Sequence, residues 1–421
     1  MAAGVSRGLL RQRNFAALWW GQLISILGER LTYLALVGLL AEHTQHFRDT
    51  GSSWLLSALA NVMLAPVLLL APFTGAWVDR WNLRRVLIAS DALRAGVVLS
   101  IPILYAWTHG VAPVFAQVFV LFTCNVFFLP AKSAITPEIV PPSQLLAANA
   151  LLSVAGIVST AVGALLGGWV IDHWGWGLAL EINAVTYVAS VAALALISYR
   201  PTEHPPADGP EGWRGYLREV GEGWRVLKGS PRVGLGLTAL AAVWMGGGFL
   251  HVAGNQHIQR AASVPGMERL GVLLCALGLG AGLSTWWINT RGRAAPRPAV
   301  LGIGLVLAAG ALAAFAASTR FAVFVASSFL VGAFVAPAFV LSETLLQEGA
   351  EPRQRGRVFS ARDFLMRLLF LLTATVAAWL TRGFGTRVAL LASACIVAVA
   401  GALAMAWGML DPALMREKGR A

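Results

Sequence analysis

Long apolar segments are the feature that most constrains this chain. Twelve of them, each of about 20 mostly apolar residues, follow one another along the sequence, and such a length spans a bilayer as a helix. They lack the alternation of barrel strands. We therefore predict an all-α membrane protein with twelve transmembrane helices, near residues 15–41, 54–77, 86–107, 112–130, 146–171, 175–198, 231–253, 270–290, 298–317, 321–342, 359–381 and 386–408.

The composition agrees with a membrane protein and excludes a soluble domain. Charged residues make up 12% of the chain, whereas soluble domains carry roughly 25%. The net charge is +12, but 23 Lys and Arg residues fall in segments on one side of the predicted membrane and six on the other. This asymmetry predicts that both termini lie in the cytoplasm. We expect a bacterial-type inner (plasma) membrane as the location. It gives no reason to expect a nucleic-acid partner.

A polar segment, 199–230, separates six predicted spans from the next six. It begins as a proline-rich linker and continues as a helix whose apolar residues recur at three- and four-residue spacing. This basic amphipathic helix either lies on the inner leaflet or packs on neighbouring loops. We expect an N-terminal six-helix bundle over 1–198, a cytoplasmic linker over 199–230, and a C-terminal six-helix bundle over 231–421.

The loop between the second and third spans, "GAWVDRWNLRR", carries a specific pattern. A glycine is followed by an acid and several bases, with Asn82 at a position where the pattern often has glycine; Asn tolerates a positive φ. This loop resembles the signature of the major facilitator superfamily, in Gly75, Asp79, Arg80, Arg84 and Arg85. The resemblance implies a fold of two six-helix bundles, alternating access, and a loop that holds the inner side closed. A plain topological anchor is the alternative.

Further stretches narrow the resemblance to one branch of that family. "FAALWWGQLISILGERL" resembles the first helix of the branch that contains macrolide, enterobactin and lysophospholipid exporters, with Glu29 where Asp is commoner. "ASDALRAG", with Asp91 and Arg94, resembles the third helix of that branch. "PAKSAITPEIVPPSQLLAANAL" resembles the loop between spans four and five of that branch, and "GRVFSARDFL" resembles the start of its span eleven. The resemblance covers most of the chain and implies export of a small molecule.

The fifth span departs from the signature of proton-driven antiporters in this family. The stretch "GIVSTAVGALLGGW" has Ala164 where that signature has proline. Small residues at this spacing permit close packing between helices. We predict that the glycines pack against neighbouring helices, namely Gly156, Gly163, Gly167 and Gly168. We also expect the triple glycine at 246–248 to break the seventh span.

Glu29 lies in the middle of the first span, where a charged carboxylate is costly and indicates function. Four polar residues share its helix face and could line a cavity, namely Gln22, Ser25, Thr32 and Tyr33. Asn61 and Asn125 either line the same cavity or bridge helices. We predict that Glu29 exchanges a proton during transport. A fixed ion pair with a base on another helix is the alternative.

The other intramembrane charges are candidates for ion pairs or gates. Arg30 points away from the Glu29 face and requires a partner from another helix, such as Glu181. Asp91 and Arg94 are spaced for a local ion pair or for contact with the loop signature. A further group near the inner ends of spans ten and eleven is predicted to form gate contacts, namely Glu343, Asp363 and Arg367.

These features predict a secondary active transporter that exports an amphipathic small molecule, such as a drug, macrolide or siderophore-like compound, in exchange for protons. The cycle would protonate Glu29 from outside and release that proton inside. An uncoupled facilitator or lysophospholipid flippase is the first alternative, and a non-transporting receptor the second. We see no catalytic constellation and expect no cofactor, no metal and a monomer in the bilayer.

Overall fold

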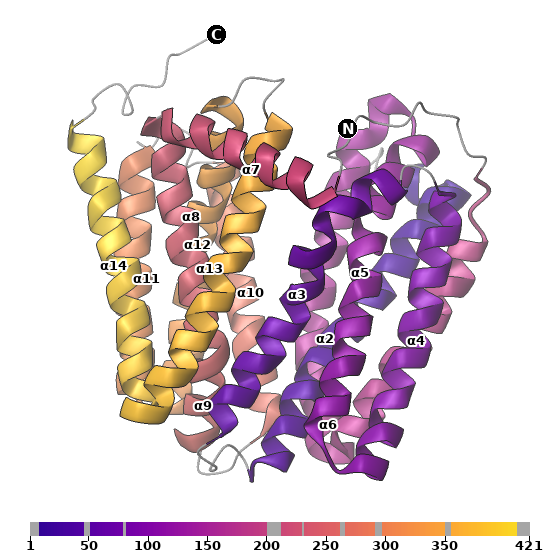
Figure 1. Ribbon diagram of the computed structural model, residues 1–421, viewed down its shortest axis with the longest axis horizontal. Coiled ribbons are helices and arrows are strands. Elements are labelled where there is room, and N and C mark those ends of the chain that lie inside the picture. Colours follow the sequence, from indigo (N-terminus) through magenta and orange to yellow (C-terminus); the bar gives the residue numbers. More distant parts are fainter. Residues whose placement is uncertain are drawn as a thin grey trace. The chain divides into compact units, whose positions relative to one another are not determined.

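The computed structural model describes residues 8–45, 51–78, 81–199, 212–229, 231–261, 266–290, 297–349 and 355–410, and the regular structure in these ranges is helical (Figure 1). The elements are α2 (Arg13–His43), α3 (Ser52–Val78), α4 (Leu83–Thr108), α5 (Val111–Ile139), η1 (Pro142–Gln144), α6 (Leu145–Ala195), α7 (Gly212–Gly229), α8 (Pro231–Phe249), η2 (Leu250–Gly254), α9 (Asn255–Ala261), α10 (Met267–Thr290), α11 (Arg297–Ala317), α12 (Phe321–Gly349), α13 (Arg355–Phe384) and α14 (Thr386–Leu410).

Among the described residues, 11 helical stretches are long and apolar enough to cross a membrane. The longest element, α6, has 51 residues. At 1.5 Å per residue it would be about 76 Å long, more than twice the thickness of the hydrocarbon core. Gly175 interrupts it with φ 87° and ψ 164°, a backbone conformation that favours glycine. α6 therefore contains two spans, and the predicted all-helical fold with twelve spans is confirmed.

The chain forms two compact units, and each contains one short piece from the other half of the sequence. The first unit comprises residues 1–40, 62–215 and 266–272, and the second comprises 41–61, 216–265 and 273–421. The start of α3 thus belongs to the second unit, and the start of α10 to the first. Both helices have residues in the two units.

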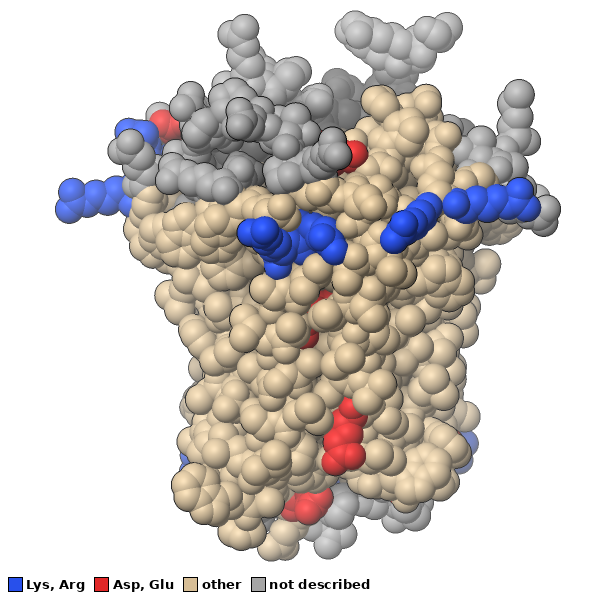
Figure 2. Space-filling view, turned by 90° about the vertical axis from the view of Figure 1, so that its right-hand side faces the viewer, with Lys and Arg blue, Asp and Glu red and all other residues tan. Residues whose placement is uncertain are grey.

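Within the second unit, α11 and α14 lie side by side (Figure 1). A Cβ on Gly302 would lie 2.8 Å from the carbonyl oxygen of Gly401, and the converse distance is also 2.8 Å. The absence of both side chains therefore permits this close approach. Figure 2 shows a different face, on the side of α4 and α6. It is mostly free of charged residues, with Lys and Arg near one end and a few Asp and Glu in the other half, as expected for a surface that faces lipid.

The seventh span is interrupted later than the glycine triplet predicts. Residues 246–248 continue the α-helix of α8, and a π-helical turn, η2, follows at Leu250–Gly254. A Cβ on Gly248 would lie 2.8 Å from the carbonyl oxygen of Phe370 in α13. The prediction of a break at these glycines is therefore wrong. Gly248 permits contact between two helices, and the irregular turn begins two residues later.

Helix α7 runs across the ends of the other helices of the second unit (Figure 1). Tyr216 is buried, and its ring lies edge-on to Phe364 of α13, with 6.1 Å between centroids. Val220 packs against an apolar cluster that includes Val233 and Leu240. Leu217 remains exposed. These contacts favour the packed alternative for this part of the amphipathic helix.

Asp172 joins the start of α10 to the rest of the first unit. Its Oδ1 accepts a hydrogen bond from the backbone N–H of Met267 at 2.7 Å, and its Oδ2 accepts one from Glu268 at 2.8 Å. The first N–H groups of a helix have no partner within the helix, and the positive end of the helix dipole favours an anion. A Cβ on Gly271 would collide with the carbonyl oxygen of Ala164. The N-terminus of α10 is thus both capped by α6 and closely packed on it.

Replacing Asp172 by Ala should lower the free energy of unfolding by about 1 kcal/mol, the typical effect of losing a helix cap. Hydrogen exchange measured by mass spectrometry should become faster at the amides of Met267 and Glu268, because both lose their acceptor. Asp172→Asn is the matched control: it keeps one side-chain acceptor and should show a smaller change. Unchanged exchange at both amides in Asp172→Ala would show that the cap contributes nothing to this contact.

Candidate functional site

The first unit contains a cavity of about 180 Å³. Charged, polar and apolar side chains line it. Its lining residues come from five helices, α2 to α6, and are Glu29, Arg30, Thr32, Tyr33, Leu36, Met63, Arg94, Leu121, Phe122, Asn125 and Tyr187. The volume is below the roughly 300–1,000 Å³ of sites that enclose a drug-sized ligand. The cavity therefore suits a head group or another part of a larger molecule.

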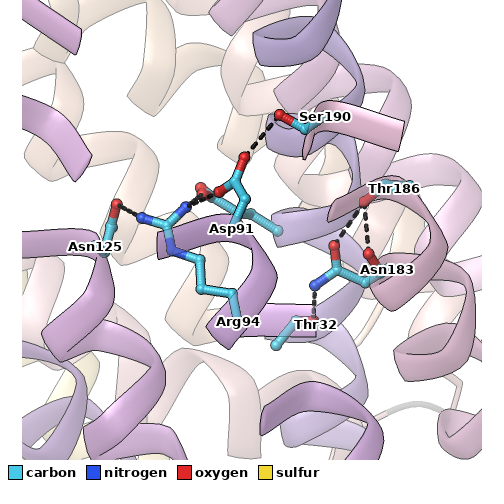
Figure 3. A network of polar contacts seen from close by, with 8 residues as sticks. Thr32, Asp91, Arg94, Asn125, Asn183, Thr186 and Ser190 are labelled. Carbon is cyan, nitrogen blue, oxygen red and sulfur yellow. Dashed lines mark hydrogen bonds and ion pairs between the residues drawn. The ribbon is translucent and has the colours of Figure 1, made fainter. Parts of the chain in front are cut away.

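A buried guanidinium, that of Arg94 in α4, connects the helices around this cavity (Figure 3). Its Nη1 lies 3.1 Å from Asp91 Oδ1 and 3.3 Å from Glu29 Oε1, and its Nη2 donates to Asn125 Oδ1 at 2.7 Å. Ser190 of α6 donates to Asp91 Oδ2 at 2.7 Å. Four helices, α2, α4, α5 and α6, thus meet in one polar network.

The members of this network differ in their access to the cavity. The side chains of Arg94 and Asp91 are 1% and 0% exposed, whereas that of Glu29 is 32% exposed. The guanidinium also lies over the ring of Phe128, 4.6 Å from its centroid. Asp91 is therefore the enclosed partner of Arg94. Glu29 is held at a longer distance and remains accessible.

Gly28 allows α2 to approach the second half of α6 next to Glu29. A Cβ at Gly28 would occupy the space of Asn183 Oδ1 and Thr186 Oγ1. Asn183 donates to Thr32 Oγ1, and Thr186 Oγ1 donates to the Asn183 carbonyl oxygen at 2.7 Å (Figure 3). This buried group of hydrogen bonds fixes the orientation of α2 at Glu29.

The first half of α6 approaches the same turn of α2. A Cβ on Gly163 would lie 2.6 Å from the carbonyl oxygen of Leu27 and 3.0 Å from the Cβ of Arg30. A Cβ on Gly167 would lie 3.2 Å from the Cα of Leu31, and one on Gly168 would collide with the backbone of Met267. The fourth predicted packing glycine, Gly156, differs: its nearest neighbour, Ile26 Cδ1, is 4.0 Å away.

Arg30 lines the cavity together with Glu29, although it is one residue further along the helix. In the part of the chain that the structure describes, no carboxylate or other acceptor binds its guanidinium, and its Nε is buried without a hydrogen bond. Glu181, the partner considered from the sequence, is exposed and does not contact it. The prediction that Arg30 is paired with a residue of another helix is therefore wrong for the described residues.

The polar residues that the sequence predicted to line the cavity fall into two groups. Thr32, Tyr33 and Asn125 line it, whereas Gln22, Ser25 and Asn61 do not. Gln22 and Ser25 share a helix face with Glu29, but they lie up to about 10 Å further along the axis, where α2 is buried. Asn61 belongs to the second unit and donates to Thr375 Oγ1 at 3.3 Å, so it bridges α3 and α13.

The loop signature is partly described. Asp79 and Arg80 lie outside the described residues, and Gly75 is in the last turn of α3. Arg84 binds the end of α6: its Nη2 donates to the carbonyl oxygen of Ala195 at 2.6 Å. Cations are favoured at helix C-termini, so this arginine joins the loop to the last helix of the first half.

Two neighbours of Arg84 complete this part of the loop. Asn82 has φ −67° and is the N-cap of α4: its Oδ1 accepts the backbone N–H of Arg85 at 3.1 Å. Asn82 therefore does not adopt the positive φ that an asparagine tolerates, because it caps a helix. The side chain of Arg85 is exposed.

The inner-end candidates of the second unit meet through an arginine that the sequence did not single out. Arg362 of α13 binds Glu343 of α12, and its Nε lies 2.9 Å from Asp363 Oδ1. Arg367 Nη1 lies 3.7 Å from Asp363 Oδ2. The sequence signal for Arg362 was a base that directly precedes an acid at the start of an apolar helix.

Sequence reasoning also missed Tyr187, which lines the cavity of the first unit. The available signal was a tyrosine inside an apolar span.

Replacing Gly28 by Ala should lower the free energy of unfolding by about 1–3 kcal/mol, because the added methyl group overpacks the contact with Asn183 and Thr186. Gly156→Ala is the matched control and should be neutral or slightly stabilising, since the site has room and Ala favours the helix. Denaturation of the purified protein in a mild detergent measures both. Equal stability of the two variants would contradict the packing assigned to Gly28.

Replacing Arg94 by Met should destabilise the chain by about 3–5 kcal/mol, because Asp91 would remain buried without a counter-charge. The double variant Asp91→Asn with Arg94→Met should recover much of that loss, since neither charge remains. With the single variant Asp91→Asn included, the same denaturation experiment gives the coupling between the two residues. A double variant as unstable as Arg94→Met would show that packing, and not charge, accounts for the effect.

Comparisons with known proteins agree with this architecture. A relative described as an uncharacterized MFS-type transporter of Mycobacterium bovis is 27% identical over 376 residues, 87% of this chain and 84% of that protein. The putative bacilysin exporter BacE of Bacillus subtilis is 26% identical, over 83% of this chain and 84% of that protein. Macrolide efflux protein A of Streptococcus pyogenes is 28% identical over 51% of each chain.

Solved structures show the same fold. The crystal structure of the peptide transporter POT in complex with sulfate has a TM-score of 0.73 at 14% sequence identity, over 99% of this chain and 100% of that one. The family model described as Major Facilitator Superfamily matches residues 18–296 and 270–421. The helical spans, the loop signature and this match across nearly the whole chain lead to one conclusion: the chain belongs to the Major Facilitator Superfamily.

Proposed function

We propose that this membrane transporter exports an amphipathic small molecule by alternating access, in exchange for protons that bind Glu29. The observation that carries the proposal is the position of Glu29: its carboxylate lines the cavity, is about one-third exposed, and contacts the buried Arg94. Relatives named as exporters of macrolides and of bacilysin support the direction of transport.

The charges around Arg94 explain how Glu29 can change its protonation without loss of the fold. Two carboxylates, Glu29 and Asp91, share one guanidinium. Asp91 is the more enclosed of the two and accepts a second hydrogen bond from Ser190. If Glu29 takes up a proton, Arg94 therefore keeps a buried counter-ion, and the large cost of an unpaired buried charge is avoided.

The lining of the cavity suits a molecule with a polar and an apolar part. Leu36, Met63, Leu121 and Phe122 contribute apolar surface, and the charged residues lie on α2 and α4. A substrate group that binds near Glu29 competes with the proton for the carboxylate. This competition is the linkage that an antiporter requires, because each ligand lowers the affinity for the other.

We further propose the bacterial inner membrane as the location, with both termini in the cytoplasm. The asymmetry of Lys and Arg between the predicted loops supports this orientation. The loop signature would then lie on the cytoplasmic side, where Arg84 holds the end of α6.

In proteoliposomes that contain a pH-sensitive dye, addition of a substrate should produce a proton flux. A panel of lipophilic cations, macrolides, siderophores and lysolipids covers the amphipathic classes. Glu29→Gln should abolish the proton signal, because the amide cannot exchange a proton, while the amount of folded protein stays the same. Glu181→Gln is the matched control, since Glu181 is an exposed carboxylate on α6 within a span.

Two results would contradict the proposed coupling. One is a full proton signal in Glu29→Gln. The other is substrate movement in the wild type that produces no proton signal and persists after an uncoupler collapses the gradient. The second result would identify an uncoupled carrier or flippase and leave Glu29 as a structural partner of Arg94.

A further inference from the structure

We infer that the cavity recognises a zwitterionic head group, with Arg30 binding its oxyanion, a carboxylate or phosphate, and Glu29 binding its ammonium group. This inference rests on the proposed function, because it takes the cavity of the first unit to be a substrate site. It adds the chemical class of the substrate and a role for Arg30.

The first argument is the difference between the two cavity arginines. The charge of Arg94 is matched by Asp91 and Glu29, and Asn125 accepts a further hydrogen bond from it. The Nε of each arginine is buried without a hydrogen bond. Arg30, however, has no carboxylate or amide partner among the described residues. A guanidinium inside a membrane protein is costly without an acceptor. An oxyanion of the ligand would supply that acceptor through the bidentate hydrogen bonds that guanidinium groups favour.

The second argument is the opposite charge of two neighbouring residues. Glu29 and Arg30 are an acid and a base, and both line the cavity. A purely anionic ligand on Arg30 would be repelled by the neighbouring Glu29. A purely cationic ligand at Glu29 would be repelled by Arg30. A ligand with both charges satisfies both residues.

The third argument is geometric. Glu29 and Arg30 are consecutive residues of α2, and both line a cavity of about 180 Å³. This volume suits a compact head group better than a whole amphiphile. Gly163 of α6 leaves room for Arg30, since a Cβ there would lie 3.0 Å from the Cβ of Arg30. The ammonium would compete with a proton for Glu29, which agrees with exchange of substrate for protons.

The test uses amphiphiles with one tail and different head groups, bound to the full-length protein in nanodiscs and measured by calorimetry. Nε-dodecanoyl-lysine carries a free ammonium and a free carboxylate. Its methyl ester keeps the ammonium alone, and its Nα-acetyl derivative keeps the carboxylate alone. Dodecyl phosphoethanolamine replaces the carboxylate by a phosphate and shows which oxyanion is preferred.

The wild type should bind the zwitterions about tenfold or more tightly than either singly charged compound, as expected for charged hydrogen bonds. Arg30→Gln should bind Nε-dodecanoyl-lysine and its methyl ester equally. Glu29→Gln should bind Nε-dodecanoyl-lysine and its Nα-acetyl derivative equally. Arg30→Lys should keep part of the preference for the carboxylate. Arg11→Gln, which removes an exposed arginine outside the cavity, should behave as the wild type.

This crossed pattern distinguishes recognition from misfolding, because a misfolded variant would bind all four compounds less well. Equal binding of all compounds by the wild type, no binding of any of them, or a uniform loss in both variants would overturn the inference. Binding requires no proton gradient. A head-group preference without proton flux would therefore defeat the proposed coupling alone, whereas proton flux without a head-group preference would defeat this inference alone.

Discussion

The first unit depends on the requirement that a buried guanidinium have partners. Arg94 lies inside a spanning helix with 1% of its side chain exposed, where an unpaired charge would cost several kcal/mol. Asp91, Glu29 and Asn125 meet this requirement from three helices, and Ser190 supports Asp91 from a fourth. The position of α2 relative to α4, α5 and α6 therefore follows from the coordination of one side chain.

Small residues then determine how close the helices come. Gly28 and Gly163 place both halves of α6 against the turn of α2 that carries Glu29 and Arg30. Since the contact at Gly163 involves backbone atoms, a side chain there would move the helix and not merely a neighbouring rotamer. The two charged residues thus sit on a closely packed turn of α2, and this rigidity keeps both of them at the cavity wall.

Helix ends supply a second kind of contact, in which charge meets the partial charge of the backbone. Asp172 binds the first N–H groups of α10, and Arg84 binds the last carbonyl groups of α6. The sequence predicts an acid-and-base pattern around Arg84, but it gives no indication that Asp172 has a partner 95 residues away. Such contacts form only where the fold brings a helix end near a charged side chain, and local sequence patterns do not show where that happens.

The sequence by itself determined the twelve spans and the family, because apolar length and loop composition are local properties that a bilayer selects directly. It also identified Glu29, Asp91 and Arg94 as the costly intramembrane charges. The tertiary structure decided which polar residues meet. Helical periodicity places Gln22, Ser25, Thr32 and Tyr33 on one face of α2. Neighbouring helices cover that face at Gln22 and Ser25, whereas Thr32 and Tyr33 line the cavity. For the same reason, only the fold could show that Arg30 lines the cavity without a protein partner among the described residues.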